Sequence, residues 1–344
     1  MSEVSIIGLD LAKTVFQVHG ATKDGGMVFN RRLRRGEVIS FFERQARCIV
    51  AMEACGGSHH WAREIGALGH EVRLLPAIYV KAYVKRNKTD AADAEAICEA
   101  AMRQNMRFVP VKSVDQQTLT TLLRTRSVLE RQRTQTINSL RGLMNEFGQV
   151  APAGPRHVTT LIARIDDEAI GLPEAARMGL RILAKTIAYQ NEQMAILDKQ
   201  LQALARQDET AKRLMTIPGV GPISAVALMA LMPDPANFTC GRTFGAWLGL
   251  TPAEHSSGGK QRQGGISKRG EKFLRRLLLL GATAVVRQAL KRPPNPRSWL
   301  GKMLATKPRM VVITALANKT ARVIWAIRAK GGVYQDQHTS ALPA

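Results

Sequence analysis

The order of strand-like and helix-like patterns near the start of the chain is the feature that most restricts the fold. The patterns follow one another as strand 3–10, strand 14–20, strand 27–33, helix 36–46, strand 48–54, helix 58–69 and strand 70–76, with a further helix after them. Pro76 ends the last of these strands, because proline has no backbone N–H to give to a ladder. Three consecutive strands followed by alternating helices and strands predict a mixed sheet that is covered by helices.

This order is also the order of the ribonuclease-H-like fold. Residues 1–112 are therefore predicted to form a ribonuclease-H-like, or RuvC-like, domain built on a mixed sheet. A different pattern begins near residue 113, where leucines recur at steps of three and four residues. The first such stretch reaches Leu143 and Phe147, and the second covers residues 183–204. We expect two long helices here.

A proline-containing segment, 150–158, separates the two leucine stretches. The pair is expected to form an antiparallel coiled-coil arm or a dimerising helix pair, and a plain helical bundle explains the same spacing equally well. Further on, the turn from Gly219 to Gly221 joins two apolar helical segments and resembles a helix-hairpin-helix. Glycine lets backbone amides come close to a phosphate, so these two glycines are candidate nucleic-acid contacts.

The predicted fold class is therefore α/β plus α. It combines a ribonuclease-H-like domain, a helical arm and a mainly α-helical C-terminal domain that contains the helix-hairpin-helix-like element. The predicted boundaries are 1–112, 113–210 and 211–332, with a tail at 333–344.

The charge balance indicates a polyanionic partner. The chain has 50 Lys and Arg against 27 Asp and Glu, a net charge of +23 and a pI of about 10.6. Between Lys260 and Arg309 the only acid is Glu271, which predicts a phosphate-binding surface, because an ordinary solvated face mixes both signs. The candidate contacts, here and just before residue 90, are Lys85, Arg86, Lys88, Lys260, Arg262, Lys268, Arg269, Arg275 and Arg276.

Other features argue against a membrane or zinc protein. No uninterrupted apolar stretch reaches the roughly 18 residues of a membrane span, and no signal peptide is recognisable, so we expect a cytoplasmic or nucleoid-associated protein. The cysteines form no CxxC pair, and His59 and His60 have no matching ligand pair nearby. We expect reduced thiols in the core. The four cysteines are Cys48, Cys55, Cys98 and Cys240.

Four acidic residues are expected to meet at one edge of the sheet. Asp10 ends the first strand and Glu53 ends the fourth, and these strands are neighbours in a ribonuclease-H-like sheet. Asp90 and Asp93 are three residues apart on one face of a helix. Two carboxylates about 4 Å apart repel by roughly 4 kcal/mol at an effective dielectric constant of about 20, so such a cluster is expected to hold divalent cations. Hard oxygen ligands favour Mg²⁺ or Mn²⁺, which can promote phosphoryl transfer.

Each acid taken alone has a simpler explanation. An aspartate after a strand is often a turn residue, and Asp90 could cap the helix that follows. The segment 8–14 also resembles the phosphate loop of actin-like sugar kinases and ATPases. Those loops usually carry a glycine after the acid, whereas Leu11 and Ala12 follow Asp10 here, and no adenosine-binding segment is evident.

A second candidate site is the pair Ser256 and Ser257, which precedes two glycines. A serine in this position is accessible, and nearby cations could stabilise an alkoxide and a pentavalent phosphorane. The residues alone favour a flexible polar loop with turn-forming Ser and Gly. His255 could accept a proton, although an incidental loop residue or a phosphate contact explains it better.

Taken together, these motifs resemble those of the IS110-family transposases, specifically the IS1111-like branch. The motifs are GLD, MEA, NKTDAADA, IPGVG and GLTPxxxSSGGKxRxGxISKRG, and they occur in family order from about residue 4 to residue 330. The resemblance implies an RNA-guided DNA recombinase of an insertion sequence. Its RuvC-like domain would bind Mg²⁺ through a D-E-D-D set, and its C-terminal transposase domain would supply a nucleophilic serine.

Carried over by motif, the acids are Asp10, Glu53, Asp90 and Asp93 and the nucleophile is Ser257, with Ser256 as the alternative if the alignment shifts by one. The resemblance implies a 5′-phosphoserine intermediate that needs no ATP. It also implies a structured bridge RNA that pairs with target and donor DNA, and a dimer that pairs into a tetramer. In the family, the serine and the acids of one active site come from different protomers.

Two other functions fit the same residues. A metal-only nuclease or junction resolvase of the RuvC type would use the acids and not the serine. A non-catalytic nucleic-acid-binding protein would use only the basic surface.

Overall fold

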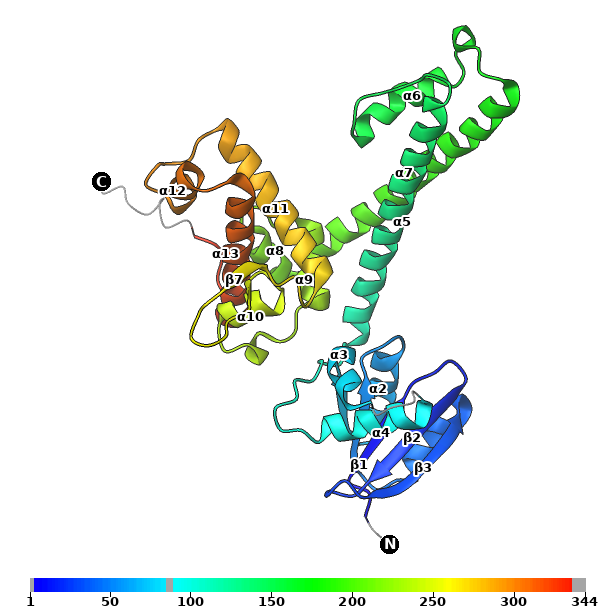
Figure 1. The fold of residues 1–344 in the computed structure, drawn as a ribbon, viewed down its shortest axis with the longest axis vertical. Coiled ribbons are helices and arrows are strands. Elements are labelled where there is room, and N and C mark those ends of the chain that lie inside the picture. The colour runs from blue at the N-terminus through cyan, green and yellow to red at the C-terminus, as the bar shows by residue number, and fades with distance from the viewer. Residues whose placement is uncertain (1–2, 85–88, 336–344) are drawn as a thin grey trace. The chain divides into compact units, whose positions relative to one another are not determined.

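The computed structural model describes residues 3–84 and 89–335, and the chain divides into two compact units, residues 1–114 and 115–344 (Figure 1). Three candidate phosphate contacts, Lys85, Arg86 and Lys88, lie outside the described residues.

A mixed five-stranded sheet forms the centre of the first unit. Its strands are β1 (Ile6–Asp10), β2 (Val15–Ala21), β3 (Met27–Arg34), β4 (Ile49–Glu53) and β5 (Glu71–Leu75), in the order β3-β2-β1-β4-β5. The β1–β2 and β2–β3 pairs are antiparallel, whereas β1–β4 and β4–β5 are parallel. The five predicted strands are confirmed, and this sheet is consistent with a ribonuclease-H-like domain.

Helices cover both faces of the sheet. The helical segments of this unit are α1 (Val38–Glu43), α2 (Ser58–Ala67), α3 (Ala77–Val80), α4 (Asp90–Ala101) and the short 3₁₀ turns Arg35–Glu37 and Lys81–Tyr83. Side chains alternate along a strand, so Ile7 and Leu9 pack in one apolar cluster with α1 and α2. Ile6 and Ala51 belong to the other cluster, which is completed by α4. The sheet therefore has two buried faces.

Two long helices dominate the first part of the second unit. They are α5 (Val114–Asn145) and α7 (Glu174–Gln207), with α6 (Val158–Arg164) and the 3₁₀ turns Pro155–His157 and Glu168–Ile170 between them in sequence. Arg126 on α5 pairs with Asp198 on α7, and Arg133 bonds to Asn191, so the two helices run antiparallel. The predicted leucine seam is wrong at its end: Leu143 and Phe147 are exposed, because the buried face passes through Met144 and packs on α6.

The remaining helices pack around one apolar core. They are α8 (Glu209–Met215), α9 (Pro222–Leu231), α10 (Gly241–Trp247), α11 (Lys272–Lys291), α12 (Trp299–Thr306) and α13 (Arg309–Lys330), with a 3₁₀ turn at Pro235–Asn237. Between α10 and α11 the chain forms a hairpin of β6 (Pro252–Glu254) and β7 (Gln263–Ile266). The hairpin carries the serine pair.

Among the described residues, α13 alone is long and apolar enough to cross a membrane by length and composition. Its buried side chains, which include Val312, Ala317, Ala321 and Ile324, belong to the core that it shares with α10 and α11. We interpret α13 as a core helix.

Candidate active site

Two of the predicted acids lie side by side at the sheet edge. Asp10 is the last residue of β1 and Glu53 is the last residue of β4, and these strands are parallel neighbours, with Leu9 opposite Met52. Strand alternation places Asp10 on the same face as Ile6, and Glu53 on the same face as Ala51. Both carboxylates therefore lie on the face that α4 covers.

Helix α4 brings the other two acids to this face. Asp90 and Asp93 lie in its first turn, where the N-terminal end of the helix dipole favours negative charge. The helix lies unusually close to β1, because a Cβ at Gly8 would stand 2.2 Å from the backbone oxygen of Ala94. Thr89 caps the helix by accepting a hydrogen bond from the Ala92 N–H at 3.2 Å, so the capping explanation of Asp90 is wrong.

The pKa of Asp10 reflects the negative charges around it. Burial, together with the charges of Asp93, Asp90 and Glu53, raises its pKa from 3.8 to about 6, while the hydrogen bond from the Leu11 N–H opposes the shift. Asp93, Asp90 and Glu53 are thus all within electrostatic range of Asp10. The Cys55 thiol belongs to the same environment, because burial and the charges of Glu53 and Asp10 raise its pKa.

The spacing of the acidic side chains decides whether they can hold a metal ion as they stand. Over residues 3–84 and 89–335, no three His, Cys, Asp or Glu side chains are close enough to hold a metal ion. The chemistry of the four acids nevertheless fits a hard divalent cation, since each offers carboxylate oxygens and their mutual repulsion would be relieved by it. Binding would have to draw the side chains together.

The serine pair lies at the tip of the β6–β7 hairpin. Gly258 and Gly259 have φ values of 57° and 75°, and the Lys260 N–H donates to the Ser257 carbonyl oxygen at 3.1 Å, as in a tight two-residue hairpin turn. The Ser256 hydroxyl donates to Glu254 Oε1 at 2.9 Å and accepts from the Arg262 N–H at 3.2 Å. For Ser257, no side-chain hydrogen bond is found within the described chain. Its exposed hydroxyl can approach a ligand.

The base of this hairpin is rigidly built. The buried guanidinium of Arg275 donates to the backbone oxygens of Leu248 and Arg269, at 2.7 and 2.9 Å. Gly270 has φ +81°, and a Cβ there would stand 1.8 Å from the Trp247 oxygen. The serine hairpin is therefore fixed between α10 and the start of α11.

The predicted phosphate contacts fall into two groups. Exposed side chains suited to a phosphate are those of Lys260, Arg262, Lys268, Arg269 and Arg276. Arg275 is only 8% exposed and is engaged with backbone, so its position favours a structural role over a phosphate contact. The single acid of the basic section, Glu271, is the N-cap of α11 and accepts from the Phe273 N–H.

The two glycines of the predicted helix-hairpin-helix turn, Gly219 and Gly221, have different surroundings. Gly219 has φ +89°, and its backbone touches α11, where a Cβ on Gly281 would stand 2.0 Å from the Gly219 oxygen. Packing thus explains Gly219 without any phosphate. Gly221 is the N-cap of α9 and has open space beside it, so it is the glycine that a phosphate could approach.

The outcome for the smaller candidates is mixed. All four cysteines are free thiols, but Cys55 and Cys240 are exposed, so the expectation of core thiols holds only for Cys48 and Cys98. His255 is exposed, and its backbone N–H donates to the backbone oxygen of Arg262 across the hairpin.

Sequence reasoning missed Gly8, Gly281 and Glu254. A sequence does not indicate which glycine will contact a helix that is distant in the chain. The pairing of Glu254 with Ser256 could have been predicted, because residues two apart on a strand lie on the same face.

Comparison with known proteins gives a consistent result. Residues 7–148 match a transposase family with a DEDD domain of the IS110 type, and residues 211–295 match the "Transposase IS116/IS110/IS902 family". A "Probable family 20 transposase" of Pseudomonas aeruginosa is 47% identical over 334 residues, which cover 96% of this chain and 99% of that protein. The transposase for insertion sequence element IS1328 of Yersinia enterocolitica is 39% identical, over 97% and 99% of the two chains. The transposase for IS1111A of Coxiella burnetii is 37% identical, over 97% and 92%.

Proposed function

Starting from the fact that this chain belongs to the IS110 family of transposases, with IS1111-like relatives, we propose that it cleaves and rejoins DNA with a serine nucleophile and a carboxylate-bound divalent cation. Transposases cleave and rejoin DNA, so the proposal concerns how this chain does so. The observation that supports it is that the charges of Asp93, Asp90 and Glu53, together with burial, raise the pKa of Asp10.

In the proposed reaction, the Ser257 oxygen attacks a DNA phosphorus and loses its proton. A new O–P bond forms as the bond from phosphorus to the 3′ oxygen breaks, so the products are a 5′-phosphoserine and a free 3′-hydroxyl. Attack by a 3′-hydroxyl on the phosphoserine reverses these steps and rejoins the DNA, so the phosphoester bond is conserved without ATP. Asp10, Glu53, Asp90 and Asp93 would hold Mg²⁺, which polarises the scissile phosphate and neutralises its charge.

The choice of Ser257 over Ser256 has a geometric argument. The Ser256 hydroxyl is engaged by Glu254 and by the Arg262 N–H, which makes it a part of the hairpin. Ser257 stands beside the two-glycine turn with an exposed side chain. The exposed cations Lys260 and Arg262 follow within the same hairpin and would contact the phosphate.

The partners are proposed from the family resemblance and the charge of +23. They are target DNA, donor DNA and a bridge RNA that pairs with both, within a tetramer in which acids and serine come from different protomers. A cytoplasmic, nucleoid-associated location follows from these partners.

Replacement of the serines tests the nucleophile. Ser257→Ala should abolish strand cleavage and the covalent protein–DNA adduct that a denaturing gel detects. Ser256→Ala should retain the adduct, because it removes only the two hydrogen bonds that the Ser256 hydroxyl makes within the hairpin. Cleavage that persists in Ser257→Ala would instead favour the metal-only nuclease, whose acids act without a serine.

The acids are tested separately. Glu53→Gln and Asp90→Asn keep the side-chain size and remove the charge, so both should abolish cleavage and its dependence on a divalent cation while DNA binding remains. Recombination that survives both changes would identify the acids as structural.

A further inference from the structure

Helix α7 carries an exposed apolar stripe along one side. The members of the stripe are Met178, Ile182, Tyr189 and Ile196, and each of these side chains is between 57% and 60% exposed. The last three are seven residues apart, and Met178 precedes Ile182 by four residues. All four therefore lie along one line of the helix surface.

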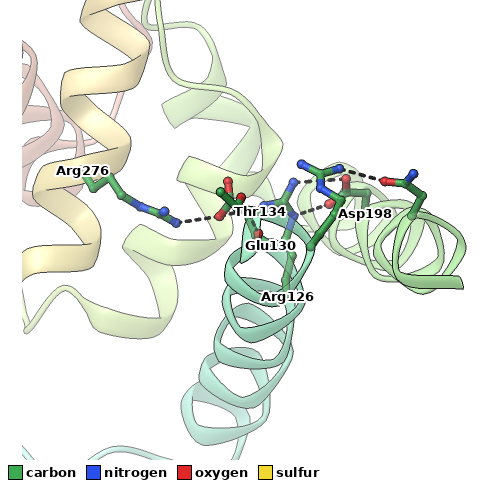
Figure 2. A network of polar contacts seen from close by, with 7 residues as sticks. Arg126, Glu130, Thr134, Asp198 and Arg276 are labelled. Carbon is green, nitrogen blue, oxygen red and sulfur yellow. Dashed lines mark hydrogen bonds and ion pairs between the residues drawn. The ribbon is translucent and has the colours of Figure 1, made fainter. Parts of the chain in front are cut away.

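The opposite side of α7 already has its partners within the chain. Ile187 belongs to the apolar cluster that contains Leu140 of α5. Asp198, further along α7, accepts a bidentate bond from Arg126 of α5 (Figure 2). At 3.6 residues per turn, Ile187 points about 160° away from Tyr189 around the helix axis. The stripe is therefore separate from the core to which α7 contributes.

The surroundings of the stripe allow a second helix to approach. Single exposed apolar side chains are ordinary on a protein surface, whereas a contiguous apolar patch marks an interaction surface. Ala188 and Ala195 flank the stripe on one side, and both are exposed. Because alanine is small, the backbone of another helix can come close to α7 there.

Two opposite charges within the stripe restrict what can cover it. Lys185 and Glu192 lie between the apolar members and are exposed, and no ion pair is found for either one within the described chain. A second α7 that ran parallel would place each charge against its own copy, which is repulsive. A second α7 that ran antiparallel would instead bring Lys185 beside Glu192 of the other copy, at two places.

We propose that this stripe is an interface between two copies of the chain, in which two α7 helices pack antiparallel about a two-fold axis at Tyr189. Such an interface uses the same patch on both copies. Ile182 of one copy meets Ile196 of the other, because both lie seven residues from the axis. The stripe contains neither the acids nor the serine, so the inference stands apart from the proposed reaction.

The first test is sedimentation equilibrium of the full chain, freed of nucleic acid. The wild type should form a dimer. Ile182→Ala combined with Ile196→Ala should raise the dissociation constant of the dimer by about tenfold or more, because the symmetric interface loses four apolar side chains. Circular dichroism should not change, since alanine favours a helix. Leu143→Ala, an equivalent change of an exposed apolar residue on α5, is the matched control and should sediment like the wild type.

The second test reverses the charges. Lys185→Glu and Glu192→Lys should each weaken the dimer, because each change puts like charges beside one another at two places. The two changes combined should restore the dimer, since both ion pairs form again with reversed sign. A parallel pair of helices gives no such rescue. Ser257→Ala should dimerise like the wild type, so the interface and the proposed nucleophile can fail independently.

The third test is disulfide cross-linking under mild oxidation, which determines the register. Tyr189→Cys should form a linked dimer, because the two copies of this residue meet at the axis. Ile182→Cys and Ile196→Cys should link to each other when the two variants are mixed, and Ile182→Cys alone should not. The wild type, in which Cys55 and Cys240 are exposed, is the control for other thiol pairs. Peptide mass spectrometry identifies the linked residues.

Several results would overturn the proposal. They are a wild-type chain that sediments as a monomer, a dimer that the double alanine variant leaves intact, and a pair of reversed charges that does not restore the dimer. Ile182→Cys that links to itself would exclude the antiparallel register. A monomeric wild type whose stripe variants lose recombination would assign the stripe to a different protein, and it would also overturn the proposal.

Discussion

At the residue scale, the charge on Asp10 opposes folding in the absence of a cation. Its folded-state pKa of about 6 exceeds the ordinary value of 3.8, so the folded chain binds this proton more tightly than the unfolded chain does. The penalty is therefore fully present above about pH 6 and fades as the pH falls toward 4.

Asp10→Asn should accordingly raise the Tm of the metal-free first unit at pH 7.5, by a few °C, and should raise it much less at pH 4.5. Adding Mg²⁺ should stabilise the wild type at pH 7.5 and stabilise Asp10→Asn far less. Thermal unfolding at the two pH values measures both effects, with the exposed Asp24→Asn as the control. A variant that is no more stable than wild type at pH 7.5 would contradict this account.

The two exposed cysteines should differ in reactivity. The Cys240 thiol lies at the start of α10, where the Thr243 and Arg242 N–H groups lower its pKa. Cys55 is exposed as a residue, but partial desolvation of its thiol and the charges of Glu53 and Asp10 raise its pKa. Because the thiolate is the reactive form, iodoacetamide at pH 7.5 should label Cys240 first, as peptide mass spectrometry can follow. Mg²⁺ should speed the labelling of Cys55 by neutralising the carboxylates, and equal rates for the two thiols without Mg²⁺ would contradict the charge assignment.

At the scale of elements, the serine hairpin depends on a glycine. Gly270→Ala places a Cβ at φ +81° and 1.8 Å from the Trp247 oxygen, so it should destabilise the second unit by roughly 2 kcal/mol or more. Gly265→Ala is the matched change in the same hairpin, where no heavy atom lies within 4 Å of the new Cβ. Urea unfolding should separate the two variants, and equal stabilities would show that the hairpin base can move.

The strands of the first unit could be predicted because period-two apolar patterns record burial directly. The same alternation placed Asp10 and Glu53 at strand ends, and the parallel pairing of β1 with β4 made them neighbours. The approach of α4 could not be predicted, because it depends on Gly8 meeting Ala94 more than eighty residues later in the chain. Arg275 was predicted to contact nucleic acid, but its guanidinium donates to two backbone oxygens instead. A run of basic residues does not indicate which of them is buried.

The arm shows the limit of spacing arguments. Leucine steps predicted both long helices, but they placed Leu143 and Phe147 in the seam instead of Met144. Leucine spacing cannot detect α6, a short helix from outside the two stretches that fills one side of the pair and shifts the buried face.

At the scale of the whole molecule, the charge of +23 is concentrated in exposed cations of the serine hairpin and the segment after it. Phosphate contacts release counterions, so each one contributes about 0.9 to the slope of log K against log salt on duplex DNA. Loss of one of these exposed cations should therefore change the salt dependence of DNA binding more clearly than it changes the affinity at a single salt concentration.

Single changes of Lys260, Arg262, Lys268 and Arg269 to Gln should each reduce that slope by about 0.9 on duplex DNA, with little effect on stability, because all four side chains are exposed. Arg275→Gln should do the reverse: it should destabilise the second unit, since two backbone oxygens lose their charged donor, and it should leave the slope of the folded protein unchanged. Binding measured from about 50 to 200 mM salt separates the two behaviours. A slope that falls for Arg275→Gln and not for its exposed neighbours would mean that the hairpin base opens to meet DNA, and that the buried guanidinium, not the surface cations, reaches the phosphate.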